Sequence, residues 1–417
     1  MNILFVVPYT PNLIRARSYN TVRKLAERGH RVHLVTLWTN EEERNNIEEL
    51  KKYCNSVRAF SMPTWRSLVN SLAALPTTQP LQAWYSWQPQ MARYVLASLE
   101  KDEIDVVHVE HLRGVKYGLY LRSRWLNHQK PARACPPIVW DSVDCISYLF
   151  RQSAVNSKRR SFRWITHLEL KRTERFEAEL TRKFPAILVT SQKDKNELLA
   201  LKNSTLSASK LNVFPIGVDL DYFCPNPQVK REVATIVVSG KMSYHANVSM
   251  VIYLFEQIMP LVWTKRPEVK LWIVGKDPTP EVKEIAHHPN VTVTGMVPDL
   301  RTYLQRATIA VAPLTYGAGM QFKVLESMAC GTPVVATPLA VSALTEAVHD
   351  RDLMVAEEPD EFAAKIIQLL DDARLRHSVG ESGRYFAEQH FSWDRLVGQL
   401  EEVYNGVIKN NNTTGTG

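Results

Sequence analysis

Short apolar runs alternate with longer amphipathic stretches along the whole chain, and this alternation constrains the fold more than any other feature. Most runs are rich in β-branched residues and apolar on both faces, as in parallel strands that helices cover on both sides. The predicted strands are residues 3–8, 32–36, 106–109, 138–140 and 187–190 in the first half, and 235–239, 271–274, 291–294, 309–312 and 334–336 in the second. The pattern predicts an α/β protein with two doubly wound domains.

The length of 417 residues also indicates two domains, because it exceeds what one ordinary core holds. The polar stretch "KNSTLSASK" (202–210) predicts the boundary, with a first domain at 1–205 and a second at 206–390. A helix at 391–409 is expected to pack back toward the first domain. Residues 410–417 have no apolar side chain and are expected to form a disordered tail.

Composition and charge narrow the class of partner. Five scattered cysteines, odd in number and without C-x-x-C spacing, favour a reducing cytoplasm and argue against a zinc site. The net charge of +8 favours anionic partners, namely a nucleotide, a phospholipid surface or a nucleic acid. We expect no nucleic-acid partner, because neither an aromatic–basic platform nor a helix-turn-helix pattern appears.

Membrane contact is expected to be peripheral at most. No run approaches the roughly 18 apolar residues of a membrane span, and the opening "MNILFVVPYT" is expected to be a first strand and not a signal peptide. The basic segment 157–183 contains interleaved apolar residues, so it can form a helix on an anionic membrane. A solvated helix that docks on the first domain is the alternative. The expected location is the cytoplasm, with possible contact to the inner face of the membrane.

The run "GAGMQFKVLESMACGTPVVAT" (317–337) predicts an anion site. The strand at 309–314 leads into a loop with two glycines, and about eleven helical residues follow before the glycine at 331. Glycines let backbone N–H groups approach a ligand, and a helix start carries partial positive charge, so loop and helix together suit phosphate. Phe322, Leu325 and Ala329 are predicted to form the stripe that faces the sheet.

Two charged residues on this helix suggest a nucleotide. Lys323 and Glu326 are three apart and therefore share a face. Beside an anion site, Lys323 can neutralise phosphate charge, and Glu326 can accept hydrogen bonds from two ribose hydroxyls. An ordinary surface ion pair is the alternative.

The same run resembles the donor-site motif of GT-B glycosyltransferases, in particular the retaining family 4 enzymes. "VLESMACGTPVVAT" matches from Glu326 onward, and further runs look like the same family: "ERGHRVHLVT", "DVVHVEHLR", "GVDLDYFCP" and "FSWDRL". The resemblance implies two Rossmann-like domains with an interdomain cleft. It also implies transfer of a sugar from a nucleoside diphosphate-sugar, with neither a metal ion nor another cofactor.

The resemblance also implies which residues bind the donor. They are Gly240, Met296, Val297, Gly317, Ala318, Gly319, Met320, Gln321 and Glu326, with Lys241 and Lys323 on the diphosphate. Met296 and Val297, in "TGMVPD", would flank the base, unless this is a plain strand-to-helix turn.

Three departures from the family pattern stand out. Ala318 replaces the first glutamate of the motif, and Asn247 or Ala246 stands where a second cation is usual, so Lys323 would supply that charge. The loop "PYTPNLIRARSYN" has Arg15 and Arg17 in place of the usual Gly-Gly, and these could face phosphate or an acidic acceptor. Lys323 with Lys241, together with the run "LIRARSYN", resembles a subgroup linked to bacterial surface polysaccharide synthesis.

Two strand ends in the first domain suggest an acceptor side. "HVEHLR" would present Glu110, His111 and Arg113, although a lone histidine is more often structural. "WDSVDCIS" would present Asp141 and Asp144, which could bind acceptor hydroxyls or equally cap the next helix.

The predicted function is sugar transfer from a nucleoside diphosphate-sugar, with UDP favoured, to a hydroxyl of a glycan or lipid-linked acceptor, with anomeric retention. The predicted catalytic residues are Glu110, His111, Lys241 and Lys323. With Ala318 in the donor loop no nucleophile is evident there, which favours departure and attack on one face of the sugar. A sugar-nucleotide epimerase of the same architecture and a non-catalytic nucleotide-binding subunit remain as rivals.

Overall fold

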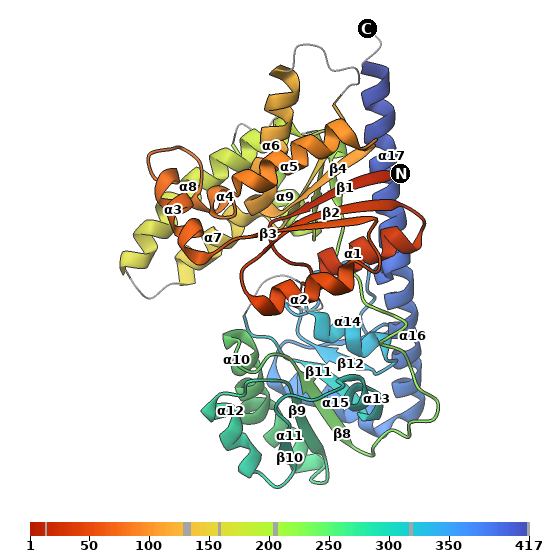
Figure 1. The fold of residues 1–417 in the computed structure, drawn as a ribbon. Coiled ribbons are helices and arrows are strands. Elements are labelled where there is room, and N and C mark those ends of the chain that lie inside the picture. The colour runs from red at the N-terminus through yellow and green to blue at the C-terminus, as the bar shows by residue number, and fades with distance from the viewer. Residues whose placement is uncertain (13–14, 128–134, 157–159, 203–206, 317–319, 415–417) are drawn as a thin grey trace. The chain divides into compact units, whose positions relative to one another are not determined.

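The computed structural model describes residues 1–12, 15–127, 135–156, 160–202, 207–316 and 320–414. The chain divides into two compact units (Figure 1). Unit 1 comprises Met1–Ile216 and Leu396–Gly417, and unit 2 comprises Gly217–Arg395. Each unit has its own parallel sheet, and together they confirm the predicted pair of α/β domains.

Unit 1 contains a seven-stranded sheet in the order β3-β2-β1-β4-β5-β6-β7. Its strands are β1 (Asn2–Val7), β2 (Arg31–Trp38), β3 (Ser56–Ser61), β4 (Val106–Glu110), β5 (Ile138–Val143), β6 (Ala186–Val189) and β7 (Leu211–Val213). Its helices are α1 (Ala16–Glu27), α2 (Glu41–Leu50), α3 (Thr64–Ala74), α4 (Leu81–Tyr85), α5 (Pro89–Lys101), α6 (His111–Asn127), α7 (Ile146–Asn156), α8 (Arg160–Lys183), α9 (Gln192–Leu199) and most of α17 (Trp393–Thr414). In Figure 1, α1 and α2 lie on one side of this sheet and α5 and α6 on the other, which explains why the central strands are apolar on both faces.

Unit 2 contains a six-stranded sheet in the order β10-β9-β8-β11-β12-β13. Its strands are β8 (Thr235–Ser239), β9 (Lys270–Val274), β10 (Val291–Val293), β11 (Ile309–Ala312), β12 (Val334–Ala336) and β13 (Met354–Val355). Its helices are α10 (His245–Tyr253), α11 (Met259–Lys265), α12 (Pro280–Glu284), α13 (Arg301–Arg306), α14 (Phe322–Ala329), α15 (Pro359–Asp371) and α16 (Ala373–Phe391). In both sheets the paired strands are parallel, so all strands of a unit end at one edge.

The boundary between the units lies later than the predicted 205/206. β7 pairs with β6 through Ile187 and Leu211, so this strand completes the sheet of unit 1, and unit 2 begins at Gly217. The polar stretch 202–210 is therefore a connection within unit 1. It misled the prediction because the strand after it has only three residues.

The end of the chain also differs from the prediction of a helix at 391–409 and a tail from 410. α17 continues to Thr414, and its residues from Leu396 onward cluster with unit 1. The side chain of Asn411 donates a hydrogen bond to the Cys135 carbonyl at 2.9 Å, which holds a polar turn of helix that has no apolar residue of its own. Residues 415–417 of the predicted tail lie outside the described residues.

One continuous helical stretch, His245–Lys265, is long and apolar enough to cross a membrane by length and composition alone. It runs through α10, a π-helical turn at Leu254–Ile258 and α11. Half of its most apolar window is buried inside the protein, with Met250, Val251 and Leu254 fully enclosed in the core of unit 2. The buried side of this stretch therefore belongs to the core of unit 2.

The basic segment predicted at 157–183 is a helix from Arg160, α8. Phe176 is 3% exposed and Leu168 is 40% exposed, so the second half docks on unit 1 while Leu168 remains at the surface. Residues 157–159 and the side chains of 160–167 lie outside what the structure describes.

Candidate functional site

Two glycines at the carboxyl edge of the unit 2 sheet are in close backbone contact. Gly240 follows β8 and Gly275 follows β9, and the Gly240 N–H donates to the Val274 carbonyl at 3.1 Å. A Cβ on Gly275 would lie 1.7 Å from the Gly240 carbonyl oxygen, and both residues have a φ that favours glycine, 153° and 155°. This close approach holds the loop that carries Lys241.

Asn247 fixes the backbone of this loop. The residue is buried, and its side-chain N–H donates to the Lys241 carbonyl at 3.0 Å, while the Lys241 side chain is exposed. The position where the family resemblance expects a second cation is therefore used for structure, and Lys241 remains available to an anion.

The predicted pair Lys323 and Glu326 lies on one side of α14, half-buried in both cases. Lys323 donates to the Gln321 side-chain oxygen at 2.9 Å. Burial lowers the pKa of Lys323 to about 8, against the effect of Glu326. Burial likewise raises the pKa of Glu326 to about 7, and Lys323 offsets only part of this shift. A ligand that supplies hydroxyl donors would favour the ionised form of Glu326.

α14 itself is shorter than the predicted eleven residues, because it begins only at Phe322. Phe322 is 36% exposed and does not belong to the buried stripe, which instead consists of Val324, Leu325, Met328 and Ala329. The spacing of three from Leu325 put Phe322 in the predicted stripe, but Phe322 is the first residue of the helix and stays at the surface. Gly317, Ala318 and Gly319 lie outside the described residues.

Other side chains at this edge surround the same strand ends. After β10, Met296 is 80% exposed and Val297 packs against the core, so only one of the predicted base-flanking side chains is free at the surface. Met320 also packs against the core. The His245 ring stacks on Tyr316 with centroids 5.4 Å apart, and the two share a hydrogen bond of 2.8 Å. Our prediction missed this pair, although Tyr316 directly precedes the glycine loop.

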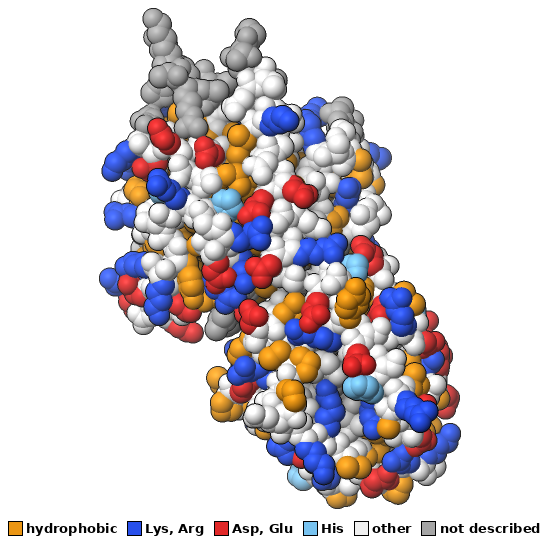
Figure 2. Space-filling view, turned by 90° about the vertical axis from the view of Figure 1, so that its right-hand side faces the viewer, with side chains coloured by type: hydrophobic (Ala, Val, Ile, Leu, Met, Phe, Trp, Pro, Cys, Tyr) orange, Lys and Arg blue, Asp and Glu red, His pale blue; other side chains and the backbone are white. Residues whose placement is uncertain are grey.

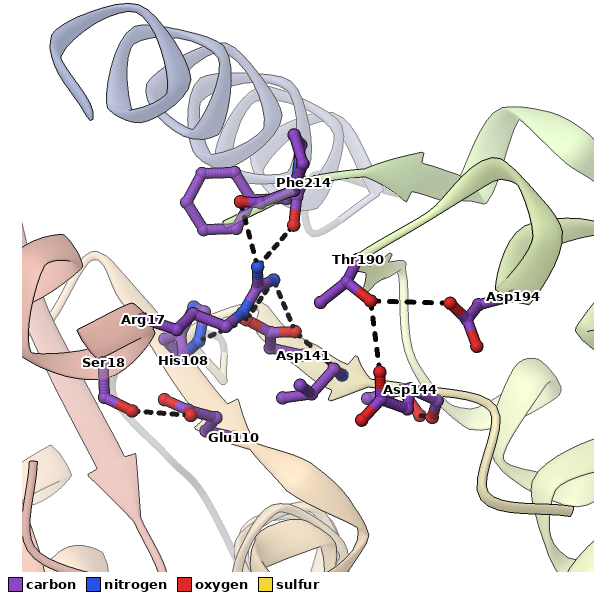
Figure 3. Close-up of polar contacts among 12 residues, drawn as sticks. Arg17, Ser18, His108, Glu110, Asp141, Asp144, Thr190, Asp194 and Phe214 are labelled. Carbon is purple, nitrogen blue, oxygen red and sulfur yellow. Dashed lines mark hydrogen bonds and ion pairs between the residues drawn. The ribbon is translucent and has the colours of Figure 1, made fainter. Parts of the chain in front are cut away.

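In unit 1, a buried ion pair lies at the end of β5 (Figure 3). Arg17 donates to both carboxylate oxygens of Asp141, at 3.0 and 2.8 Å, and also to the Phe214 and Pro215 carbonyls. His108 lies 3.5 Å from Asp141 and shares a 2.8 Å hydrogen bond with the hydroxyl of Tyr404 on α17. Burial opposes ionisation of Asp141, but Arg17 and then His108 outweigh it and lower the pKa to about 2.

This pairing corrects the predicted acceptor roles of Arg17 and Asp141. Both side chains are at least nine-tenths buried and bind each other, so neither faces a ligand. Arg15 is partly exposed but pairs with Glu43 at 2.9 Å. The prediction failed because the partners are 124 residues apart in the chain.

Glu110 ends β4 in a buried position. Its carboxylate accepts hydrogen bonds from the Ser18 hydroxyl at 2.6 Å and from the Tyr9 hydroxyl. Burial raises the pKa of Glu110, and the charge of Asp141 raises it further. Only 1% of the residue is exposed, so Glu110 would act on a ligand through Tyr9 or Ser18 and not by direct contact.

Two residues at the strand ends have strained backbones. His111 follows β4 with φ 64°, and Val143 ends β5 with φ 67°. Such conformations cost about 1–3 kcal/mol each in residues other than glycine and occur often at functional sites. Burial and then Arg113 lower the pKa of His111 to about 4, so its imidazole is neutral near pH 7.

The remaining predicted acceptor residues have separate surroundings. Asp144 accepts a hydrogen bond from Thr190 at 3.2 Å, and burial and then Asp194 raise its pKa to about 6. The guanidinium of Arg113 lies 5.0 Å from the Tyr85 ring centre, and its buried Nε has no hydrogen-bond partner among the described residues.

Neither aspartate caps α7, which was the alternative role. The first amides of that helix, those of Ile146 and Ser147, donate instead to Glu177 of α8 at 2.8 and 3.2 Å. Sequence spacing could not reveal this cap, because Glu177 is about 30 residues away.

Comparison with known proteins agrees with this fold. A family model described as Glycosyltransferase Family 4 matches residues 16–222, and one described as Glycosyl transferases group 1 matches residues 233–372. Two doubly wound domains together with these two matches place the chain in the GT-B class of glycosyltransferases. Within that class, the chain belongs with the family 4-like glycosyltransferases.

Curated relatives match over part of their length. The MMP alpha-(1->4)-mannosyltransferase of Mycolicibacterium hassiacum is 27% identical over 59% of this chain and 58% of its own. The phosphatidyl-myo-inositol mannosyltransferase of Mycolicibacterium smegmatis is 28% identical over 46% of this chain and 51% of its own. The matches thus span little more than half of each relative.

Solved structures match over nearly the whole fold. A glycosyltransferase from Rickettsia africae has a TM-score of 0.68 at 15% identity, covering 98% of this chain and 99% of its own. Anabaena HepE in complex with UDP has a TM-score of 0.66 at 14% identity, covering 97% of this chain and 100% of its own. The likeness confirms the GT-B architecture.

Proposed function

We propose that this protein transfers a sugar from a nucleoside diphosphate-sugar to an acceptor hydroxyl, with anomeric retention. The observation that carries the proposal is the half-buried pair of Lys323 and Glu326 at the carboxyl edge of the unit 2 sheet, where open α/β sheets bind ligands. Relatives named as mannosyltransferases and inositol phosphate glycosyltransferases support this class of reaction.

We propose UDP as the nucleotide, because HepE of similar fold was solved with UDP and with UDP-glucose. In this assignment Glu326 accepts hydrogen bonds from the ribose hydroxyls, and Lys241 and Lys323 bind the diphosphate. Charge grows on the diphosphate as the glycosidic bond breaks, and preorganised cations stabilise that charge. We propose no cofactor and no metal ion.

On the acceptor side we propose His111, with its neutral imidazole, as the group that contacts the attacking hydroxyl. The strained backbone at the end of β4 supports this role. Arg113 and Asp144 would bind neighbouring polar groups of the acceptor, a glycan or a lipid-linked glycan. Because Glu110 is buried, it would position Tyr9 and Ser18 and would not itself act as the nucleophile.

The location of the protein and its further partners are proposed on separate grounds. We propose a cytoplasmic protein, supported by five free cysteines, with segment 157–183 in contact with an anionic membrane surface. We propose no nucleic-acid partner. On the face shown in Figure 2, acidic and basic side chains of the described residues are interspersed, whereas a nucleic-acid site needs a continuous basic surface.

Thermal unfolding with UDP, GDP, ADP and dTDP tests the donor site. A nucleotide at about 100 times its dissociation constant adds roughly 2.7 kcal/mol of stability. We expect UDP to stabilise the wild type and the control Glu256→Ala, whose glutamate is exposed in the same unit, but not Glu326→Ala. Stabilisation of Glu326→Ala equal to that of the wild type would overturn the ribose assignment.

Product analysis then separates transfer from its rivals. NMR of a UDP-sugar incubated with the protein and without acceptor would show isomerisation if the protein were an epimerase. Nucleotide binding with neither transfer nor isomerisation would instead support a non-catalytic subunit.

A further inference from the structure

Helix α3 presents its apolar residues to solvent and its small or polar residues to the protein. Trp65, Leu68, Val69, Leu72 and Leu75 are 48–64% exposed, and their spacing places them on one stripe. We call these five residues the α3 stripe. The opposite side of the helix is anchored by buried Ser67 and Ala74, and by Asn70, which donates to the Trp87 carbonyl at 2.8 Å. An ordinary surface helix instead buries its apolar side and exposes its polar side. An exposed apolar stripe of this kind indicates a binding surface.

The sequence on both sides of the α3 stripe lacks acidic residues, and the unit that contains it is basic. The sequence contains no acidic residue between Glu49 and Glu100, a span that includes the whole of α3, α4 and all but the end of α5. Unit 1 has 34 basic and 21 acidic residues, a net charge of +13, whereas unit 2 has 17 and 22, a net charge of −5. The positive excess of the chain thus belongs to the unit that carries the stripe.

Basic helix α8 contacts the end of α3 and the start of α4. Arg172 of α8 donates to the Leu75 carbonyl at the end of α3, at 2.8 Å, and buried Glu169 accepts from the Leu81 amide at 2.8 Å. Leu168, next to Glu169, is 40% exposed. Between Asp144 and Glu169 the sequence contains five basic residues and no acidic one: Arg151, Lys158, Arg159, Arg160 and Arg163. Arg172 thus connects the end of the α3 stripe to the described part of α8, whose preceding sequence is basic.

We propose that the α3 stripe inserts into an anionic lipid surface, with Trp65 and the leucines below the headgroups and basic residues of unit 1 on the lipid phosphates. Amphipathic helices bind membranes in this way, with the apolar face buried ≈ 5–10 Å. A second copy of the chain fits less well. A two-fold pair would bring the same patch against itself and oppose like charges, and one helix stripe is small beside a stable interface.

Vesicle sedimentation tests this surface without any nucleotide, so its outcome is independent of the proposed transfer reaction. The probes are vesicles of phosphatidylcholine alone and of phosphatidylcholine with phosphatidylglycerol. We expect the wild type to bind the anionic vesicles and not the neutral ones. Leu68→Lys/Leu72→Lys should bind at least about tenfold more weakly despite its added positive charge, because it can no longer insert.

The control is Val233→Lys/Tyr385→Lys, which adds the same charge at residues 82% and 63% exposed in unit 2 and should bind as the wild type does. Unfolding temperature confirms that each variant is folded. The proposal would be overturned if the Leu68/Leu72 variant bound as tightly as the wild type or more tightly. It would also be overturned if the wild type bound both kinds of vesicle equally, or bound neither. A wild-type dimer that the Leu68/Leu72 substitutions convert to a monomer would assign the stripe to a second copy instead.

Discussion

Asp141 and Glu326 are both carboxylates shielded from water, yet their surroundings move their pKa values in opposite directions. Burial disfavours the charge of Asp141, but Arg17 and His108 outweigh it and bring the pKa to about 2. Burial dominates at Glu326 and raises the pKa to about 7. Asp141 is therefore a satisfied structural anion, whereas Lys323 compensates the charge of Glu326 only in part.

Asp141→Asn should destabilise unit 1 strongly. The substitution leaves the buried Arg17 charge uncompensated, and breaking a buried ion pair in this way typically costs about 3–5 kcal/mol. Urea unfolding measures the loss. The control Glu179→Gln breaks an ion pair with Lys183 in which the carboxylate is 53% exposed, and it should change stability by less than about 1 kcal/mol. Equal effects of the two substitutions would contradict the structural role of Asp141.

Glu326→Gln should stabilise the ligand-free protein at alkaline pH. Burial raises the pKa of Glu326 in the folded state. Its contribution to the free energy of unfolding is therefore fully present below pH 4.5, the ordinary pKa of a glutamate, and is lost as the pH rises through about 7. The glutamine variant lacks this loss, so it should gain roughly 1–2 kcal/mol over the wild type at pH 8 and nothing at pH 4. Urea unfolding at both pH values provides the test, and a gain of the same size at pH 4 would speak against it.

At the scale of elements, strand ends and their loops determine where the candidate site lies. Loops after β8, β9, β10 and β11 all emerge at one edge of the unit 2 sheet, because the paired strands are parallel. The contact of Gly240 with Gly275 joins two of these loops. The sequence pattern predicted the strands and the glycine loop, but this contact depends on the pairing of β8 with β9.

Gly275→Ala should disrupt this edge. The added methyl would lie 1.7 Å from the Gly240 carbonyl oxygen, so the loop that carries Lys241 has to move. We expect a loss of about 2–4 kcal/mol and weaker binding of UDP. Gly295→Ala is the matched control, since its φ of 67° also favours glycine but no atom lies within 4 Å of the added Cβ. It should lose only about 1–2 kcal/mol of backbone strain. Calorimetry with and without UDP compares the two variants.

At the scale of the molecule, the chain crosses from one unit to the other and its last helix returns to the first. Four residues beyond the crossing point in α17 are nearly fully buried: Leu396, Val397, Leu400 and Tyr404. Tyr404 also shares a hydrogen bond with buried His108. Unit 1 therefore depends on both ends of the chain, whereas unit 2 is one continuous segment.

A chain that ends at Arg395 should lose the fold of unit 1 and keep that of unit 2. Removal of residues 396–417 exposes the core that α17 covers, while the proposed UDP site of unit 2 keeps all its residues. Hydrogen exchange should therefore show loss of protection in β4 and not in β8. A chain that ends at Lys409 serves as the control and should retain both. Protection of β4 in the shorter chain would show that α17 is dispensable.

The sequence by itself determined the class of fold and the centre of the proposed donor site. Parallel strands covered by helices produce short runs that are apolar on both faces, and a glycine loop before a helix is a local pattern, so both can be read without tertiary contacts. The placement of Lys323 and Glu326 on one side of α14 was predicted in this way, because a spacing of three puts two residues on the same side of a helix.

Only the tertiary structure decided the features that join distant parts of the chain. Edge strand β3, with its partly exposed residues, and the very short β7 and β13 carry too little apolar pattern to be predicted. Whether an arginine faces a ligand or a buried carboxylate depends on contacts across many residues, as Arg17 shows. The side of α3 that faces solvent is likewise decided by what packs on its other side, because an apolar spacing looks the same whether the stripe is buried or exposed.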